Sequence, residues 1–464
     1  MRLPLPNLLM GIVVGGLMMH ATHAWAQPAT PATRLIQEIA GHSELMLNLE
    51  ELCDGIGPRL TGSHQLRTAQ AWAIEKLKRY GAVNVHLEAY DLGKPWQRGL
   101  ARARLLNANG IALDIAQQAW TRGTGGVVKA DVALLDVKTL DQFKASAPAL
   151  KGKIVLVVSA PKPTPEQQND IKRYRADLSE ALGAAQFAAV LWVSGRDGNL
   201  LDMWGGPGPH FNSGAAIITK ENASLLKRLL AKGVVPRVEI ELTGGFKASP
   251  GNAYNVVGDL PGTDGSGEMV ILGAHQDSWD LGSGATDNGS GTVVMLVVLR
   301  AMQASGMKPK RSLRVVLFSG EEQGLLGSKA YLEAHRAELG KIQAVLVQDA
   351  GAGRIMGFTD MKVEAWYAAL KAAIAPAAEL GALDVAYAIA GGSDQLTFFN
   401  EGISAFVATQ DPLDYGSHTQ HSQVDSIDHV KQANLVQGAQ VMAVTAWGLL
   451  NGERLPHQKH ADKP

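Results

Sequence analysis

Short apolar runs alternate with stretches of helical apolar spacing along the C-terminal half of the chain. The apolar runs lie at 269–275, 312–320, 344–351 and 404–410. Between them, apolar residues recur at helical spacing around 292–302, 327–335 and 363–380. This alternation is typical of a mostly parallel, mixed sheet with helices on both faces. We therefore predict an α/β fold for this half of the chain.

The N-terminal part of the chain also follows a helical pattern before it becomes extended. Apolar residues recur at helical spacing over 34–52, and the motif GPRLTGS at 57–63 interrupts that pattern. A second helical stretch then continues to about Tyr80, and a strand follows near 83–90. We expect a helical hairpin followed by one strand.

Residues 101–245 have a different character. They carry β-rich runs, such as VVKADVALLD and KIVLVVSA, together with short helices around 140 and 172–186. No cluster of His, Asp and Glu follows an apolar run here, so we expect this region to shape a site rather than to perform chemistry. We predict an inserted domain at 101–245, within a discontinuous domain at 34–100 and 246–452. A polar tail at 453–464 follows.

The first 26 residues have the composition of a secretory signal peptide. Arg2 precedes the apolar residues 8–19, and Ala24-Trp25-Ala26 forms a small-x-small cleavage site before Gln27. An uncleaved membrane anchor is the alternative, but a spanning helix needs about 20 apolar residues. We therefore predict a signal at 1–26 that is removed, a secreted or periplasmic protein, and no stable membrane insertion afterwards.

The balance of charged residues bears on which classes of partner the protein can bind. The 43 Lys and Arg residues nearly balance the 44 Asp and Glu residues, so nothing predicts an electrostatic interaction with nucleic acid or acidic membranes. Cys53 is the only cysteine and has no intrachain disulfide partner. It lies in the amphipathic segment LEELCDGIG, which favours a small buried residue over a nucleophile.

Acidic and imidazole side chains lie at or just after the ends of four separate predicted strands. They are His275 with Asp277, Glu321 with Glu322, Asp349, and the loop from His418 to His421. The Glu pair alone would indicate a solvated turn or the first turn of a helix. A hydrolytic metal site, however, needs ligands that converge from several strands and a carboxylate that contacts water. The combination therefore predicts such a site.

The segment 269–291 supplies the first part of this predicted site. His275 and Asp277 are two residues apart in an extended segment, so Asp277 can orient a ligating imidazole; Asp280 is the alternative. Asp287 follows a loop rich in glycine, where the backbone can approach an ion closely. Asp287 could cap the next helix, or it could bridge two cations with its two oxygens.

These residues resemble the di-zinc exopeptidases of the secreted aminopeptidase family, and within that family the carboxypeptidase Q (plasma glutamate carboxypeptidase) branch. The similarity rests on GPRLTGS, GAHQDSWDLGSGATDNGSG, KPKRSLRVVLFSGEEQGLLGS, VQDAG, GGSDQ and HSQVDS. Their order and spacing extend through nearly all of residues 35–450. The resemblance implies the zinc exopeptidase fold, and it implies that the inserted region is a protease-associated domain.

The resemblance also implies a ligand set for two zinc ions per chain. His275 and Asp349 would bind one zinc, Glu322 and His421 the other, and Asp287 would bridge them. His421 fits the family spacing because an Asp followed by Ser comes four residues later. This chain departs from many relatives by having Ser426 where they have Thr.

Glu321 would be the general base and Asp277 the group that orients His275. His418 lies outside the family spacing and could be a loop residue near the substrate or an ordinary surface histidine. Asp394, in GGSDQ, could orient the ligands, contact substrate or satisfy its own turn.

The resemblance implies an exported exopeptidase that hydrolyses dipeptides or short peptides through a metal-bound hydroxide. It also allows a homodimer. Two alternatives stay open: a catalytically silent peptide-binding or scaffold protein on the same fold, and an enzyme similar to the glutaminyl cyclases. The sequence leaves open whether the enzyme acts as an aminopeptidase, a dipeptidase or a carboxypeptidase, and which side chains it prefers.

Overall fold

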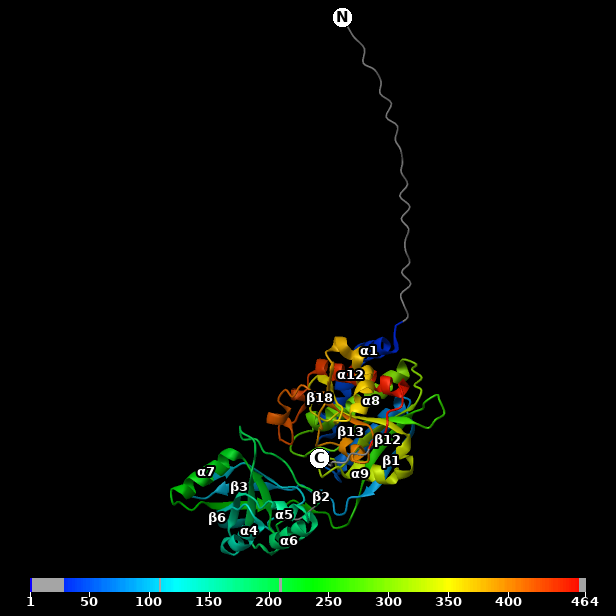
Figure 1. Cartoon of the computed structure of the whole chain (residues 1–464). Helices are drawn as coiled ribbons and strands as arrows, with labels where there is room; N and C mark the ends of the chain where they lie inside the picture. Colours follow the sequence, from blue (N-terminus) through cyan, green and yellow to red (C-terminus); the bar gives the residue numbers. More distant parts are fainter. Residues whose placement is uncertain (2–28, 108–109, 208–210, 459–464) are drawn as a thin grey trace.

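The computed structural model describes residues 1, 29–107, 110–207 and 211–458 (Figure 1). Apart from Met1, the predicted signal at 1–26 lies outside the described residues. Within the described part of the chain, every helix is too short or too polar to cross a membrane. Two eight-stranded sheets, each with its own helices, form two bodies that meet near β2 (Figure 1).

The first sheet combines the N-terminal and C-terminal parts of the chain. Its strands, in spatial order, are β1 (Val83–Asp91), β12 (Asn252–Leu260), β14 (Ser312–Phe318), β13 (Met269–His275), β15 (Ile342–Val347), β18 (Ala405–Gln410), β16 (Ile355–Thr359) and β17 (Asp384–Ala386). The four central strands, β14, β13, β15 and β18, are parallel to one another. At one side β1 and β12 pair antiparallel with their neighbours, and at the other β16 pairs antiparallel with β18 and parallel with β17. The sheet is therefore mixed with a parallel centre, as predicted.

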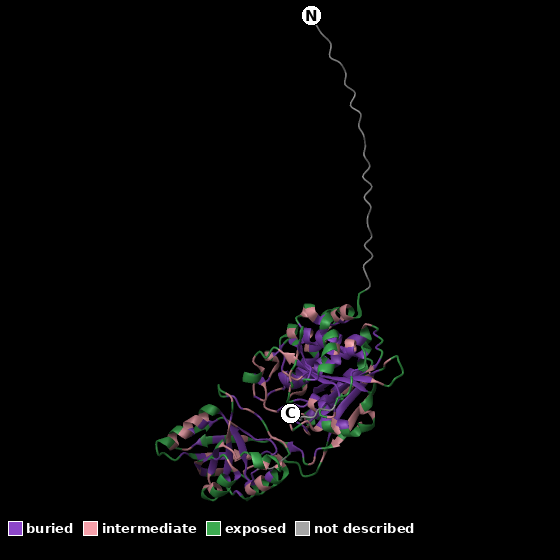
Figure 2. Cartoon of the chain, in the orientation of Figure 1, coloured by how far each residue is buried: buried purple, intermediate pink, exposed green. Residues whose placement is uncertain are grey.

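Helices cover this sheet. They are α1 (Pro31–Gly41), α2 (Leu45–Glu50), η1 (Glu51–Ile56), α3 (His64–Arg79), η3 (Ala285–Gly289), α8 (Ser290–Ala304), α9 (Leu326–Ala334), η4 (Arg336–Lys341), α10 (Glu364–Ile374), η5 (Ala375–Leu380), α11 (Gln395–Phe399), η6 (Tyr415–Thr419), η7 (Ile427–His429) and α12 (Gln432–Asn451). All seven residues of β13 are buried, which requires cover on both of its faces (Figure 2).

Two helical predictions need correction. The stretch 363–380 is not one helix: α10 ends at Ile374 and a 3₁₀ turn follows, because Pro376 cannot donate an α-helical hydrogen bond. The stretch 34–52 is likewise divided between α1 and α2, where the Ser43 hydroxyl accepts from the Leu45 amide. The long helix α12 had no sequence prediction, because its residues are buried on nearly all sides and lack an amphipathic stripe.

The second sheet is built entirely from residues within 101–245. Its spatial order is β4 (Ile111–Leu113), β3 (Ala101–Leu105), β10 (Arg237–Leu242), β6 (Val128–Asp136), β7 (Ile154–Ser159), β8 (Ala189–Val193), β9 (Ala215–Ile218) and β5 (Ile115–Gln117). Its helices are α4 (Leu140–Ser146), η2 (Ala147–Leu150), α5 (Pro165–Gln168), α6 (Ile171–Ala184) and α7 (Lys220–Ala231). That this region is a protease-associated domain stays a prediction.

The chain crosses between the two bodies twice, at adjacent positions. The short strands β2 (Trp96–Gln97) and β11 (Gly245–Phe246) pair antiparallel with each other at these crossings. The described part of the polar tail, residues 453–458, packs against the first body rather than extending freely. The Gln343 side chain donates to the Glu453 carbonyl, and Leu455 is buried.

Candidate metal centre

The parallel centre of the first sheet brings three of the predicted groups to one edge. His275 is the last residue of β13 and pairs in register with Phe318, the last residue of β14. Glu321 and Glu322 follow β14, and Asp349 follows β15. Because parallel strands end at the same edge, these short connections place all the side chains together.

The first group of candidate ligands joins His275 to two carboxylates. Its Nε2 atom lies 3.0 Å from Asp349 Oδ1 and 3.2 Å from Asp287 Oδ1. The three side chains are almost completely buried. One ligand atom from each lies within 4.8 Å of the others, which is close enough for one cation.

The second group is built around His421. Its Nε2 atom lies 3.0 Å from Glu322 Oε2 and 3.4 Å from Asp287 Oδ2. These ligand atoms also lie within 4.8 Å of one another. Asp287 therefore belongs to both groups, with one oxygen facing each imidazole. Its predicted alternative role as a helix cap does not occur, since Gly289 is the residue that precedes α8.

The chemistry of this cluster fits a pair of zinc ions. Two imidazoles and three carboxylates are ligand types that zinc prefers. Asp287 Oδ2 and Glu322 Oε1 are buried without a hydrogen-bond partner among the described residues, and such atoms are costly unless a cation or proton neutralises them. In the described part of the chain, no lysine or arginine forms an ion pair with these carboxylates, so divalent ions would supply the missing positive charge.

Burial and mutual repulsion perturb the acid-base behaviour of the second group. Burial, reinforced by Asp287, raises the pKa of Glu322 to about 7. Burial alone would lower the pKa of His421, but Glu322 and Asp287 raise it to about 9. Glu322 and His421 thus hold protons near neutral pH that a metal ion would displace.

Glu321 lies beside both groups at the wall of a cavity of about 490 Å³. Burial raises the pKa of Glu321 well above its ordinary value; the carboxylates of Asp349 and Glu322 add to this rise, while His275 opposes it. Asp349, Glu322 and His421 line the same cavity, which brings the predicted base and the predicted ligands to one accessible space.

Asp277 contacts His275 through its backbone, whereas the sequence predicted a contact through its side chain. The closest partner of the His275 Nδ1 atom is the backbone carbonyl oxygen of Asp277 at 2.9 Å, and the Asp277 carboxylate lies 3.6 Å away. The carboxylate instead accepts from the Thr61 hydroxyl at 2.9 Å and from the Glu321 amide at 3.4 Å. It thereby ties the predicted base to the strand that carries His275.

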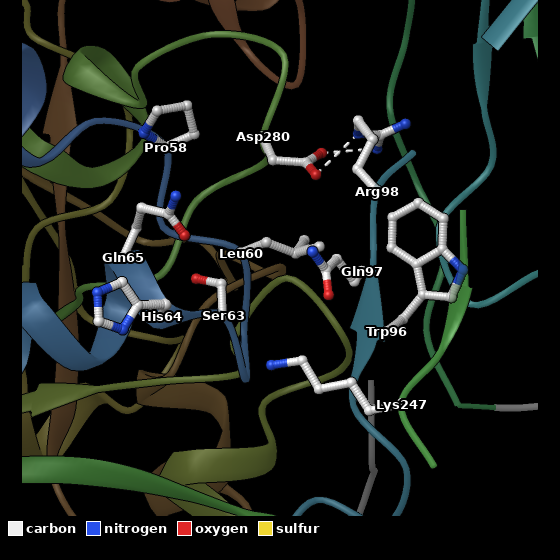
Figure 3. A pocket seen from close by; sticks show the side chains of 10 residues that line it. All are labelled: Pro58, Leu60, Ser63, His64, Gln65, Trp96, Gln97, Arg98, Lys247 and Asp280. Carbon is white, nitrogen blue, oxygen red and sulfur yellow. Dashed lines mark hydrogen bonds and ion pairs between the residues drawn. The ribbon is translucent and has the colours of Figure 1, made fainter. Parts of the chain in front are cut away.

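The alternative orienting residue, Asp280, lies elsewhere. Its carboxylate accepts two hydrogen bonds from Arg98, of 2.8 and 2.6 Å. This pair borders a separate cavity of about 360 Å³ at the junction of the two bodies, beside Trp96 and Lys247 (Figure 3). None of the candidate metal ligands lines that cavity, so Asp280 is excluded as a partner of His275.

Two residues without a predicted role support the loop that presents Asp287. Arg59 is completely buried and donates to the carbonyl oxygens of Gln276, Ser283 and Gly284. Asp425 accepts from the Thr286 and Asp287 amides at 2.7 and 3.1 Å. Both residues lie in motifs of the sequence, GPRLTGS and HSQVDS, but no local pattern indicates which distant loop they contact.

The structure also gives the surroundings of three other residues considered in the sequence analysis: Asp394, His418 and Cys53. Asp394 is fully buried beside the first group, and burial raises its pKa to about 7. His418 is exposed, and its ring is hydrogen-bonded to the Ser417 hydroxyl, away from both groups. Cys53 is buried, and burial raises the pKa of its thiol to about 11, so it behaves as a packed apolar residue.

Residues 255–446, which carry all five candidate ligands and Glu321, match the model of peptidase family M28. The chain contains a peptidase family M28 domain. This match confirms the family-level resemblance, because the domain spans the same strands and loops that form the metal cluster.

Proteins of known name extend this similarity beyond the M28 domain. Carboxypeptidase Q of Mus musculus is 31% identical over 308 residues, which cover 65% of this chain and 63% of that protein. The match thus spans less than two thirds of the relative's length.

Solved structures agree with the fold. A peptidase M28 precursor from Shewanella amazonensis SB2B is 27% identical, with a TM-score of 0.78 over 92% of this chain and 98% of that one. BSAP, a zinc aminopeptidase from Bacillus subtilis, is 18% identical and shares the fold, with a TM-score of 0.65 over 91% of this chain and 95% of that one.

Proposed function

We propose that this protein is an exported di-zinc exopeptidase that hydrolyses dipeptides or short peptides. The observation that carries the proposal is that His275 and His421 each face a different oxygen of Asp287. Two metal positions that share one carboxylate, beside a buried glutamate in an open cavity, are suited to hydrolysis. The relative named carboxypeptidase Q and the zinc aminopeptidase of similar fold support this choice.

Each residue of the cluster has a role in the proposed reaction. His275 and Asp349 would hold one ion, Glu322 and His421 the other, and Asp287 both. When bound, zinc polarises a carbonyl group and lowers the pKa of water toward neutrality. Glu321 accepts the proton of the attacking water and later delivers it to the departing amine.

The surroundings of Glu321 suit this proton transfer. Its raised pKa, caused first by burial, keeps the carboxyl group able to hold a proton between the two transfers. Its amide donates to the Asp277 carboxylate, which Thr61 also holds, so the backbone at the base is fixed relative to His275. Asp277 thus positions both the base and one ligand.

The lining of the cavity favours the amino end of a peptide. Its residues are Asp287, Glu321, Glu322, Gly324, Leu325, Asp349, Gly391, Gly392, Tyr415, Gln420 and His421. This set contains no lysine or arginine, the residues that usually recognise a terminal carboxylate. A peptide bound by its carboxyl end would lack a cationic partner in this lining, so we propose cleavage of the first residue from a free amino end.

One experiment tests the activity, its direction and its metal dependence together. The purified protein is incubated with free dipeptides, with N-acetylated and C-amidated versions of them, and with aminoacyl reporters, in added zinc and in chelator. We expect zinc-dependent cleavage that survives C-amidation and is lost on N-acetylation. Cleavage lost on amidation would instead show carboxypeptidase action, and ammonia release from Gln-initiated peptides without chain cleavage would show a cyclase.

Export and homodimer formation are parts of the same proposal. Export rests on the predicted signal at 1–26, so the mature protein should begin at Gln27. Sequencing the N-terminus of protein recovered from outside the cytoplasm checks this. Sedimentation of the mature protein checks whether it is a homodimer.

A further inference from the structure

We propose that the inserted region positions His421, so that the second metal position depends on the docking of residues 194–204. We call these residues the docking loop; they follow β8 in the second body. The inference rests on the proposed di-zinc site, and it states that the two metal positions differ in what supports them. The position formed by Asp287, Glu322 and His421 requires the inserted region, whereas the position formed by His275, Asp287 and Asp349 does not.

Hydrogen bonds join the docking loop to the segment that carries His421. The Met203 amide donates to the carbonyl oxygen of His421 itself, at 2.8 Å. Two residues further along, the Gln423 side chain accepts from the Leu201 amide at 2.9 Å and donates to the Asn199 carbonyl at 3.0 Å. The inserted region therefore contacts the backbone of His421 and the side chain of Gln423.

A fourth hydrogen bond lies on the other side of His421. The Arg196 guanidinium donates to the Gly416 carbonyl oxygen at 2.7 Å. Arg196 is largely buried, and its charge lies near Asp202 of the same loop, at 3.6 Å. The docking loop thus holds the His421 segment at both ends, from Gly416 to Gln423.

The backbone of His421 itself needs such support. Its φ angle is +57°, in the left-handed region that a non-glycine residue adopts only at some cost. Such a conformation persists when surrounding contacts fix it. The Met203 hydrogen bond to the His421 carbonyl is one of those contacts, so docking directly stabilises the conformation that aims the imidazole at Glu322.

Apolar packing joins the same two bodies behind the imidazole. Trp279 is 4% exposed, and its ring meets the His421 ring edge-on with centroids 6.0 Å apart. Trp279 shares one apolar cluster with Leu201 and Met203 of the docking loop. Undocking would expose this face of Trp279 and remove the support behind His421.

The first metal position, formed by His275, Asp287 and Asp349, is supported by the first sheet. His275 ends β13 and Asp349 follows β15, two adjacent central strands of the first sheet. Their side chains are 1% and 6% exposed, compared with 29% for His421. The sheet core, rather than the inserted region, holds these ligands in place.

The test uses the full-length protein and a variant that loses three of the docking hydrogen bonds, Arg196→Ala/Gln423→Ala. Zinc binding is measured by dialysis against buffered free zinc at graded concentrations, with zinc per chain read by mass spectrometry. We expect one ion to bind as in the unaltered protein and the other to bind about 10-fold to 100-fold more weakly, as for other groups that orient a metal ligand.

Two further variants make the result specific. Arg102→Ala/Arg104→Ala removes ion pairs to Glu241 and Glu239 within the inserted region, away from the docking loop, and should bind both ions normally. Arg196→Lys alone keeps a donor for Gly416 and both Gln423 hydrogen bonds, and should bind both ions nearly as the unaltered protein does. Circular dichroism confirms folding of each variant.

The zinc measurements distinguish failure of the di-zinc function from failure of the positioning role of the inserted region. If the unaltered protein binds fewer than two ions, the di-zinc function fails. If it binds two, and Arg196→Ala/Gln423→Ala also binds two with unchanged affinity, the positioning role is wrong while the function stands. Equal loss of affinity for both ions in the docking variant would also overturn the selective role. So would a loss of zinc affinity in the Arg102→Ala/Arg104→Ala control. If the docking variant does not fold, normal binding by Gln423→Ala alone would overturn it.

Discussion

The Arg59 guanidinium donates a hydrogen bond of 2.8 Å to the carbonyl oxygen of Gly284, three residues before Asp287. The same side chain donates to the carbonyl oxygens of Gln276 and Ser283. One fully buried cation therefore fixes both ends of the loop between the first candidate ligand and the shared one.

Replacement of Arg59 by Met should destabilise the protein by about 2–4 kcal/mol, because buried carbonyl groups lose their donors. Urea unfolding followed by circular dichroism measures this loss. Arg34→Met, at an exposed position of α1, is the matched control and should change stability by less than about 0.5 kcal/mol. Equal stability of the Arg59 and Arg34 variants would show that Arg59 does not support the loop.

Thr61 is predicted to act on the metal site through Asp277. Thr61→Val removes the hydroxyl that donates to the Asp277 carboxylate but keeps a similar volume. Since groups behind the ligands tune metal affinity, we expect zinc to bind about 10-fold more weakly. Thr61→Ser retains the donor and should bind zinc nearly normally. Competition with a zinc-binding dye measures both affinities, and equal values for the two variants would contradict this role.

Glu321→Gln should separate catalysis from metal binding. The substitution removes proton transfer but leaves the five candidate ligands intact, so zinc content should stay at the unaltered level while kcat falls at least about 100-fold. Glu322→Gln is the matched change at the adjacent residue and should lose the second zinc. Zinc loss from Glu321→Gln with retention by Glu322→Gln would reverse the two assignments.

Zinc removal should destabilise the fold as well as stop the reaction. Without metal, burial raises the pKa values of Asp349 and Glu322, and repulsion of each by Asp287 adds to the rise. A ligand present at about 100 times its Kd stabilises the folded state by about 2.7 kcal/mol. Thermal unfolding should therefore occur several degrees lower in chelator than in zinc-saturated chelator. Equal melting temperatures would contradict binding in this cluster.

The sequence predicted the fold and the site edge well for a physical reason. In a parallel sheet, consecutive strands end at one edge, so polar residues placed directly after apolar runs must meet there. His275, Glu321, Glu322 and Asp349 all follow such runs, and the structure brings them together. His421, at the end of a long loop, came from the family resemblance rather than from a strand pattern.

The contacts that the sequence did not predict are long-range. Thr61 reaches Asp277, Arg59 reaches Gly284, and Met203 reaches His421 across more than one hundred residues of chain. No periodicity or spacing encodes such pairs, because they depend on how segments that are distant in the chain pack within the first body or, for Met203, between the two bodies. The orientation of Asp277 also depended on the strand ending at His275, which lets the imidazole reach a backbone carbonyl.

The most direct measurement is a zinc titration of metal-free protein during hydrolysis of an unblocked dipeptide, with released amino acids counted. We predict no hydrolysis without zinc, and activity that rises to a plateau by about two equivalents of zinc per chain. Glu321→Gln should keep at most about 1% of the plateau activity at any zinc concentration. Hydrolysis that is independent of zinc, or its absence from the zinc-loaded unaltered protein, would contradict the account.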